Sequence, residues 1–399
     1  MAPKSPKKLF LVDAMGFIFR AFFAPMDRLQ NKGVPTKVPY LFSNMLRRVT
    51  KDLQPDYVAV VFDPAGPTFR DKLFSDYKAQ RPPMPDDLSI QIPFVRRMCE
   101  AMRLPIIEVP GYEADDVIGA LARQSASRDV DVYIVTSDKD MMQLVGGRVR
   151  VLRPGQGAGK PDVILDAAKV EEAMGVPPEK VADVMALMGD SVDNIPGARD
   201  PNEKPPPGER RKAGIGEVGA RELIRQFGSA EECIRRAAEI KRASYREALQ
   251  KYGEFVRLSK QLAIIQGDAP VALDLEGLAR REPDFALLRD LYADLGFTSL
   301  LKDLPAVTTT STVVTDYAAL DSAAAVREFL NAQPLDRPMA VWLTLDSGAR
   351  EIEGYGARVA GFELSPGPGV ARSAWCDPKG ELLAPLRAFL SDGRRNDPR

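Results

Sequence analysis

Three short runs of apolar residues in the N-terminal part of the chain each end in an aspartate. They are LFLVD (residues 9–13), YVAVVFD (57–63) and VYIVTSD (132–138), and each is rich in β-branched or aromatic side chains. An uninterrupted apolar run of this length is typical of a strand that is buried on both faces. The pattern therefore predicts three buried strands, each followed by an acid.

Stretches with helical periodicity lie between these runs, at residues 38–53 and 115–128. Strands that alternate with helices are typical of a parallel α/β sheet. Ligands bind to such sheets beyond the carboxyl ends of the strands. We therefore expect Asp13, Asp63 and Asp138 to meet at one edge of a sheet and to mark a site there.

The pattern changes along the chain. From about Pro178 to about Leu301 it is helical almost throughout, so residues 7–180 are predicted to form the α/β core and residues 181–302 a helical region. Residues 303–316 are rich in threonine and contain a proline, which indicates a linker.

A small separate α/β piece is predicted for residues 317–399. Its pattern indicates a helix over Ala318–Leu330, a strand over Met339–Leu345 and further short strands. A division into several regions is consistent with the length of the chain, because 399 residues are too many for one ordinary domain.

Composition narrows the chemistry. The chain has no histidine, which excludes Ser-His-Asp and Cys-His catalysis, a histidine general base and His-ligated zinc. The three cysteines, Cys99, Cys233 and Cys376, are far apart and form neither a zinc motif nor a disulfide framework. Catalysis must therefore depend on carboxylates, lysines, tyrosines or a metal ion held by oxygen.

Hydropathy and charge bear on location and partners. No apolar run approaches the roughly 18 residues of a membrane helix, and the basic start MAPKSPKK leads into a run that Asp13 interrupts. We therefore expect a cytoplasmic protein with no membrane partner. The net charge of −1 suits an enzyme without a polyanion partner, unless metal ions neutralise a group of the acids.

Acidic residues recur at short spacings near the predicted strand ends and helix ends. These nine are Asp13, Asp63, Glu113, Asp115, Asp116, Asp138, Asp140, Asp190 and Asp193. Acids gathered this densely need cations, and Mg²⁺ prefers oxygen ligands. Two such ions are the usual device for phosphodiester hydrolysis. Each small group alone could be a helix cap or a turn, so it is their shared placement that favours a metal site.

Six motifs, in order, resemble the flap-endonuclease family, and above all the 5′–3′ exonuclease domain of bacterial DNA polymerase I. The motifs are LFLVDAMGFIFRAFFA, VVFDPAGPTFRDKLFSDYKAQRPPMPDDL, EVPGYEADDVIGALA, VYIVTSDKDMMQLV, ALMGDSVDNIPG and GIGEVGARELI. The likeness covers about residues 7–302. It implies a PIN-like parallel-sheet core and a helical helix–hairpin–helix (H3TH) region. The implied activity is Mg²⁺-dependent, structure-specific 5′–3′ exonuclease and flap-endonuclease hydrolysis of DNA in replication and repair.

The resemblance also implies roles for residues and partners. The nine acids would bind two or three Mg²⁺ ions, for which Mn²⁺ can substitute. Lys78 and Arg81 would be catalytic and grip the scissile phosphate, with Arg20 and Arg70 as supports. If their stretch is helical, the i, i+3 spacing lets Lys78 and Arg81 face one phosphate. Tyr77 is either a base-stacking side chain or a core tyrosine.

The glycines of the last motif imply a hairpin that binds duplex phosphates and a monovalent ion such as K⁺. They are Gly214, Gly216 and Gly219. The implied substrates are flap, nicked or 5′-ended duplex DNA and RNA primer strands, bound by a monomer.

The chain departs from the family in three places. Residues 198–213 form a charged, proline-rich insert before the GIG motif, and Leu41 stands where the family has a small residue. Residues 317–399 are similar to the start of a proofreading 3′–5′ exonuclease domain with an RNase H-like fold. Leu343 and Leu345 replace its Asp-x-Glu pair, so we expect a partial, degenerate domain in which both leucines are buried.

Other interpretations stay open. The chain could be the N-terminal fragment of a full DNA polymerase I with nucleotidyltransferase activity. A PIN-type ribonuclease shares the acidic site, but the basic pair Lys78 and Arg81 and the glycine hairpin favour DNA flaps. A non-catalytic DNA-binding module would predict lost acids, and all nine are present.

Overall fold

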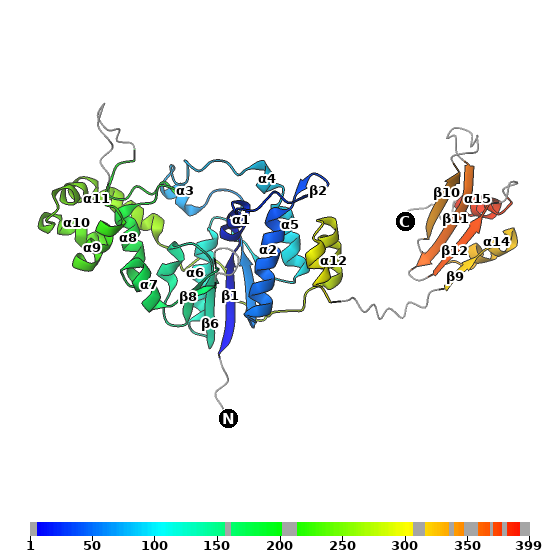
Figure 1. The fold of residues 1–399 in the computed structure, drawn as a ribbon, viewed down its shortest axis with the longest axis horizontal. Helices are drawn as coiled ribbons and strands as arrows, with labels where there is room; N and C mark the ends of the chain where they lie inside the picture. The colour runs from blue at the N-terminus through cyan, green and yellow to red at the C-terminus, as the bar shows by residue number, and fades with distance from the viewer. Residues whose placement is uncertain are drawn as a thin grey trace, which may run out of the picture. The chain divides into compact units, whose positions relative to one another are not determined.

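The computed structural model describes residues 6–155, 161–201, 214–305, 316–334, 339–346, 358–367, 370–376 and 381–391. The chain divides into two compact units, Met1–Pro305 and Ala306–Arg399 (Figure 1). Of the predicted insert only residues 198–201 are described, and of the predicted linker only residues 303–305 and 316. No helix in the described ranges is long and apolar enough to cross a membrane.

A six-stranded sheet with the order β5-β4-β1-β6-β7-β8 forms the centre of the first unit. Its neighbouring strands are parallel, except that β8 runs antiparallel to β7. The strands are β1 (Lys7–Asp13), β4 (Tyr57–Val61), β5 (Ile106–Ile107), β6 (Val130–Val135), β7 (Val149–Arg153) and β8 (Val163–Leu165). The three predicted strands are confirmed as β1, β4 and β6.

Both faces of this sheet are buried, because alternate side chains of β1 enter two different apolar layers. Phe10 and Val12 pack with one group of helices, and Leu9 and Leu11 pack with another. The first group is α1 (Ala14–Phe22), α2 (Lys37–Arg47), α5 (Ile92–Ala101), α12 (Phe285–Asp294) and α13 (Thr298–Lys302). The second layer includes α6 (Ala114–Ser125) and α7 (Ala167–Met174).

The remaining elements of this part are short. The predicted helix over residues 38–53 is confirmed as α2, which a π-helix, η1 (Arg48–Asp52), extends. The other elements are the β2 (Gln30–Asn31) and β3 (Val34–Pro35) hairpin, α3 (Phe69–Leu73), α4 (Asp86–Ser89), and the 3₁₀ turns η2 (Asp140–Leu144) and η3 (Pro178–Lys180).

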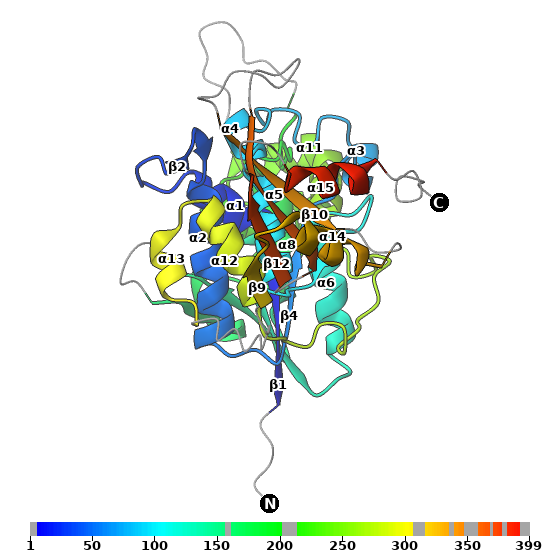
Figure 2. The ribbon, with the colours of Figure 1, turned by 90° about the vertical axis from the view of Figure 1, so that its right-hand side faces the viewer.

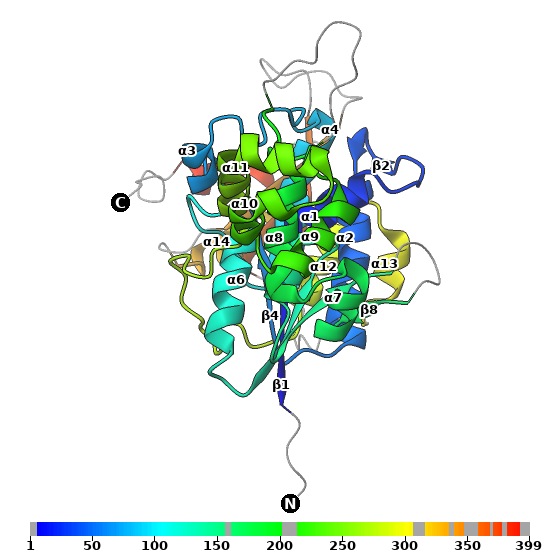
Figure 3. The same ribbon diagram turned by 90° about the vertical axis from the view of Figure 1, so that its left-hand side faces the viewer.

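The predicted helical region is present, and its first helices gather beside the sheet (Figure 3). They are α8 (Val181–Met188), α9 (Glu217–Phe227), α10 (Ala230–Arg235), the 3₁₀ turn η4 (Ala237–Glu239) and α11 (Ala243–Ala263). Their apolar side chains continue the layer of α6, whereas α12 and α13 return to the opposite face of the sheet. The α/β core and the helical region therefore form one compact unit.

The second unit is a four-stranded sheet with the order β10-β11-β12-β9 (Figure 1), and its two helices can also be followed in Figure 2. Apolar side chains of both its helices pack with this sheet in one small core. Its elements are β9 (Asp316–Ala319), α14 (Ala323–Asn331), β10 (Ala340–Asp346), β11 (Arg358–Gly367), β12 (Val370–Trp375) and α15 (Leu383–Leu390).

Two predictions for this second unit are wrong. The helix expected from Ala318 begins at Ala323, because Asp316–Ala319 pairs with β12 as a parallel strand and Ser322 caps the helix. Leu343, expected in the core, is 46% exposed, because β10 is an edge strand. The side chain of Leu345 lies outside the described residues.

Candidate active site

A cavity of about 160 Å³ lies where the carboxyl ends of β1, β4 and β6 meet. Seven of the nine predicted acids line it: Asp13, Asp63, Glu113, Asp115, Asp138, Asp140 and Asp193. Lys78 and Arg81 line it as well, and Leu262 and Ile265 from the end of α11 add an apolar wall. Strand ends, the start of α6 and loops therefore bring residues that are far apart in the sequence into one polar cavity.

Asp13 is held firmly at the end of β1. Its Oδ1 accepts a hydrogen bond from the Gly16 amide (2.9 Å) and its Oδ2 accepts one from the Thr136 hydroxyl (2.8 Å). A Cβ atom on Gly16 would collide with this carboxylate, so the start of α1 requires glycine there. Burial raises the pKa of Asp13 to about 6, although both hydrogen bonds oppose the shift.

Asp115 and Asp140 are the acids in the least favourable surroundings for a negative charge. Burial raises the pKa of Asp115 well above its usual range, and the charges of Asp13 and Asp138 raise it further. Burial, and then the charge of Asp138, does the same for Asp140. Asp140 Oδ1 is buried and has no hydrogen-bond partner among the described residues. Such an oxygen is costly unless a cation or proton satisfies it.

Lys78 and Arg81 reach the acids directly. Lys78 Nζ lies 2.6 Å from Glu113 Oε1, and the Arg81 guanidinium pairs with Asp193. This stretch is not helical, since Lys78 lies in a turn with φ +55° and its amide donates to the Asp193 carbonyl, so the i, i+3 argument does not apply. Both cations nevertheless face the same cavity.

Arg70 and Asp116 were expected to bind phosphate and metal, but the structure places both in the protein interior, 2% and 0% exposed. Arg70 donates two hydrogen bonds to Asp116, at 2.6 and 2.9 Å, and others to Glu113 and to the carbonyls of Leu262 and Ile264. Asp116 also accepts from two backbone amides, so each of its oxygens has two donors. Arg70 lines the acidic cavity, but in this arrangement its N–H groups are already engaged, and Asp116 does not line the cavity. We name this pair the Arg70–Asp116 pair.

Tyr77 and Arg20 are also engaged within the protein. Tyr77 lines the cavity but is only 5% exposed, and its hydroxyl donates to Glu113 Oε2 at 3.1 Å, which favours the core tyrosine over the base-stacking side chain. Arg20 is half-buried and donates to Ser137 Oγ and to the Pro154 carbonyl at 3.3 and 3.2 Å.

Two features of the cavity's surroundings were missed by sequence reasoning. Thr136 fixes Asp13, and Lys139 lies 3.5 Å from Asp190. Like Asp116, Asp190 does not line the cavity, and its carboxylate also accepts a hydrogen bond from the Val192 amide. Thr136 could have been found, since it lies between a predicted strand and Asp138. Lys139 could also have been found, since it lies between the predicted acids Asp138 and Asp140.

The glycine hairpin lies at the start of α9. Gly216 caps this helix and has open space around it, and Ile215 is buried beside it. Gly219 has another reason to be glycine, because a Cβ there would collide with the ring of Tyr245. Gly214 and Gly216 therefore remain candidates for backbone contact with a phosphate, whereas Gly219 serves close packing.

The donor set fits hard divalent cations, because it is made of carboxylate oxygens of which several resist ionisation without a counter-charge. In the described part of the chain, no three acidic, histidine or cysteine side chains are already gathered around one point as a metal requires. Lys78 and Arg81 hold Glu113 and Asp193 in ion pairs instead. The carboxylates would have to turn toward a bound ion.

The first consequence to measure is the pH dependence of metal binding. Folded Asp13 keeps its proton up to about pH 6, whereas an unfolded aspartate loses it near pH 4. Without metal, the free energy of unfolding should therefore fall as pH rises through this window. Affinity for Mg²⁺ should rise over the same window, because binding requires the ionised form. Calorimetric titration at about pH 5.5 and 7.5, in two buffers of different ionisation enthalpy, should detect proton release. An affinity for Mg²⁺ that does not change with pH would contradict the prediction that Asp13 must lose its proton to bind metal.

Comparison with known proteins agrees with this geometry. Residues 8–175 match the family described as 5′-3′ exonuclease, N-terminal resolvase-like domain, and residues 211–286 match 5′-3′ exonuclease, C-terminal SAM fold. The 5′-3′ exonuclease of Aquifex aeolicus is 34% identical over 298 residues, which cover 75% of this chain and 95% of that protein.

Longer relatives and a solved structure cover a similar share of the chain. DNA polymerase I of Bacillus caldotenax is 36% identical over 298 residues, covering 75% of this chain and 32% of the polymerase. The matched part thus spans about a third of such relatives. T5 5′-exonuclease with bound zinc has a TM-score of 0.52 and 19% identity, covering 72% of this chain and all of that one, which supports the fold. The chain belongs to the 5′–3′ exonuclease family.

Proposed function

We propose that this chain is a Mg²⁺-dependent nuclease that hydrolyses DNA at flaps, nicks and 5′ ends, as in removal of RNA primers. The observation that carries the proposal is the convergence of seven carboxylates with Lys78 and Arg81 on one cavity. Two or three divalent ions held there would supply an activated water and neutralise charge on the reacting phosphate. We assign this binding to the seven acids that line the cavity, and leave Asp116 and Asp190 out of the set.

The positively charged side chains of Lys78 and Arg81 are proposed to act on the substrate rather than on the metal ions. Lys78 and Arg81 end beside Glu113 and Asp193, two of the acids that would hold the metal ions. We propose that they move from these carboxylates to the scissile phosphate when substrate binds. The planar guanidinium of Arg81 can grip two phosphate oxygens, whereas Lys78 offers a mobile point charge.

Lys78→Ala and Arg81→Ala are each expected to lower the single-turnover cleavage rate about 10²-fold, and to weaken DNA binding much less, because they act where charge develops. Quenched-flow cleavage of a 5′-labelled flap and a gel-shift titration measure the two effects. Lys72→Ala removes a neighbouring exposed lysine outside the cavity and serves as the control. Loss of duplex affinity with an unchanged single-turnover rate would contradict the assignment.

Duplex binding is proposed for the hairpin at Gly214–Gly216 and the start of α9, where backbone N–H groups and the helix terminus favour a phosphate. A monovalent ion such as K⁺ is proposed at the same turn. The names of the longer relatives favour action together with a polymerase domain in one protein.

Metal dependence and choice of nucleic acid test the proposal against the ribonuclease alternative. Cleavage of a DNA flap should stop in EDTA, return with Mg²⁺ or Mn²⁺, and exceed cleavage of a single-stranded RNA of equal length. Preference for the RNA would favour a PIN-type ribonuclease. Binding of the flap without any cleavage would favour a non-catalytic DNA-binding module.

The second unit is proposed to lack 3′–5′ exonuclease activity. Proofreading chemistry needs two metal ions on carboxylates at a strand end, and Leu343 and Leu345 offer no oxygen to either ion. The full chain with Asp115→Ala, which disables the 5′ site, should leave a 3′-labelled primer with a mismatched end intact in Mg²⁺ or Mn²⁺. Shortening from the 3′ end above a buffer control would contradict this.

A further inference from the structure

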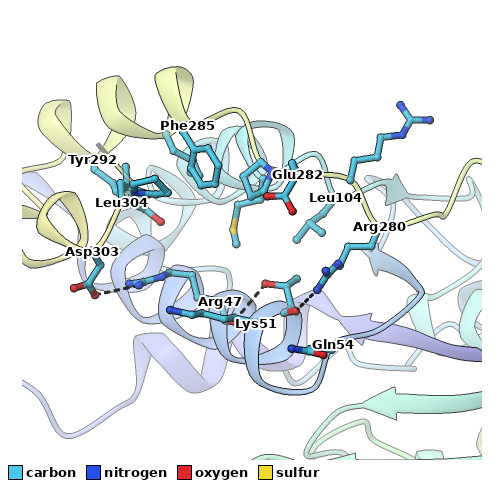
Figure 4. Close-up of a pocket in the computed structure, with 16 residues that line it drawn as sticks. Arg47, Lys51, Gln54, Leu104, Arg280, Glu282, Phe285, Tyr292, Asp303 and Leu304 are labelled. Carbon is cyan, nitrogen blue, oxygen red and sulfur yellow. Dashed lines mark hydrogen bonds and ion pairs between the residues drawn. The ribbon is translucent and has the colours of Figure 1, made fainter. Parts of the chain in front are cut away.

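A second cavity lies on the first unit, at the other edge of the sheet from the acids. Its volume is about 350 Å³, and it shares no lining residue with the acidic cavity. It is bounded by η1, by the segment before α12 and by Leu304 (Figure 4). Gln54 and Leu104, which line it, precede β4 and β5, whereas the acids follow the strands. The two cavities are therefore separate sites.

One wall of this second cavity is cationic. Arg47, Lys51 and Arg280 extend along it (Figure 4). Arg47 pairs with Asp303 at 3.0 Å, and Arg280 donates to the Thr50 carbonyl at 2.8 Å, so each guanidinium is held in place with other N–H groups to spare. Lys51 is exposed, and its ammonium group has no hydrogen bond or ion pair to another described residue. An anionic group would find a prepared set of donors here.

The opposite wall is apolar with one acid. The ring of Phe285 and the side chain of Leu104 face the cavity, and the Glu282 carboxylate lies between them (Figure 4). Within the described ranges, Glu282 has no hydrogen-bond or ion-pair partner. A carboxylate in this position accepts hydrogen bonds from hydroxyl or amino groups of a ligand. The two walls together suit a molecule with a flat apolar ring, hydrogen-bond donors and an anionic end.

Size and backbone conformation support a small-molecule site. Ligand pockets commonly have volumes of about 300–1,000 Å³, so this cavity lies at the small end of that range and suits one nucleotide rather than an oligonucleotide. Its floor includes a π-helix, an element that is often found at functional sites. Gln54 at its rim has φ +48°, a conformation that a non-glycine residue adopts only at a cost.

We propose that this cavity binds a nucleoside monophosphate. The phosphate would lie against Arg47, Lys51 and Arg280, the base against Phe285, and a ribose hydroxyl or base amino group would donate to Glu282. This inference goes beyond the proposed nuclease function, because DNA hydrolysis at the acidic edge requires no such site.

Isothermal titration of the full wild-type chain with AMP, in EDTA, tests the proposal. AMP should bind, and adenosine and inorganic phosphate should each bind at least about tenfold more weakly, since each engages only one wall. Lys51→Ala and Glu282→Gln should each lower AMP affinity about tenfold. Lys241→Ala, an exposed lysine of the helical region, should leave it unchanged. Because all three positions are exposed, the variants should fold as the wild type does.

Several results would overturn the proposal. Undetectable binding of AMP would show that the proposed site does not exist. If inorganic phosphate bound as tightly as AMP, the proposed role of the apolar wall would be wrong. AMP affinity unchanged in both Lys51→Ala and Glu282→Gln would place the ligand elsewhere. Loss of AMP binding in Lys78→Ala, with Lys51→Ala unaffected, would assign it to the acidic cavity.

Discussion

Asp115→Ala should abolish cleavage, with a rate loss on the order of 10³-fold or more, while binding of the flap persists or improves. Asp115 lines the cavity among Asp13, Asp63 and Asp138, and their charges together with burial raise its pKa well above the usual range. Removing it takes away a proposed metal ligand and relieves repulsion of the DNA. Single-turnover cleavage and a binding titration of the same flap measure the two effects.

The control is Asp290→Ala, which removes an exposed aspartate on α12, away from the cavity. It should cleave like the wild type. Normal turnover of Asp115→Ala with Mg²⁺ would rule out the proposed metal site.

Arg70→Ala should lower the free energy of unfolding by about 3–5 kcal/mol, because it leaves Asp116 buried and charged without its partner. The change also removes the hydrogen bonds from Arg70 to the carbonyls of Leu262 and Ile264, at the end of α11. Through these bonds and its bonds to Asp116, Arg70 connects the end of α11 with the start of α6. Urea denaturation with and without Mg²⁺ measures the loss.

Two further variants separate this structural role from a phosphate contact. Arg70→Lys keeps the charge but cannot make the paired hydrogen bonds, so it should recover only part of the stability. Asp116→Asn should also be destabilising. If Arg70→Ala unfolds like the wild type but loses affinity for DNA, Arg70 binds phosphate and the role of the Arg70–Asp116 pair is wrong.

The fold of the first unit could be predicted because its signals are local and repeated. Unbroken apolar runs identified β1, β4 and β6, and the rule that parallel sheets bind ligands beyond their strands placed Asp13, Asp63 and Asp138 at one edge. Strand β9 escaped prediction because its four residues are all exposed and carry no alternation of apolar and polar side chains.

The different roles of the neighbouring acids Asp115 and Asp116 could not be predicted. Asp115 and Asp116 are neighbours on α6 and so point in different directions, and the sequence does not tell which one faces the cavity. The answer depends on Arg70, which is 46 residues from Asp116 in the sequence and enters the interior only in the folded chain. Tyr77 is a similar case, since its role follows from a hydrogen bond to Glu113 rather than from its own motif.

The most direct test of the central claim is the polarity and product of cleavage on a DNA flap labelled differently at its 5′ and 3′ ends. With Mg²⁺, the wild-type chain should release a short 5′-labelled product by cutting at the branch point, and the 3′ label should stay on the annealed remainder of the same strand. Asp115→Ala should release neither product. Release of the 3′ label, or cleavage by the wild type that persists in EDTA, would contradict a metal-dependent 5′ nuclease at this acidic edge.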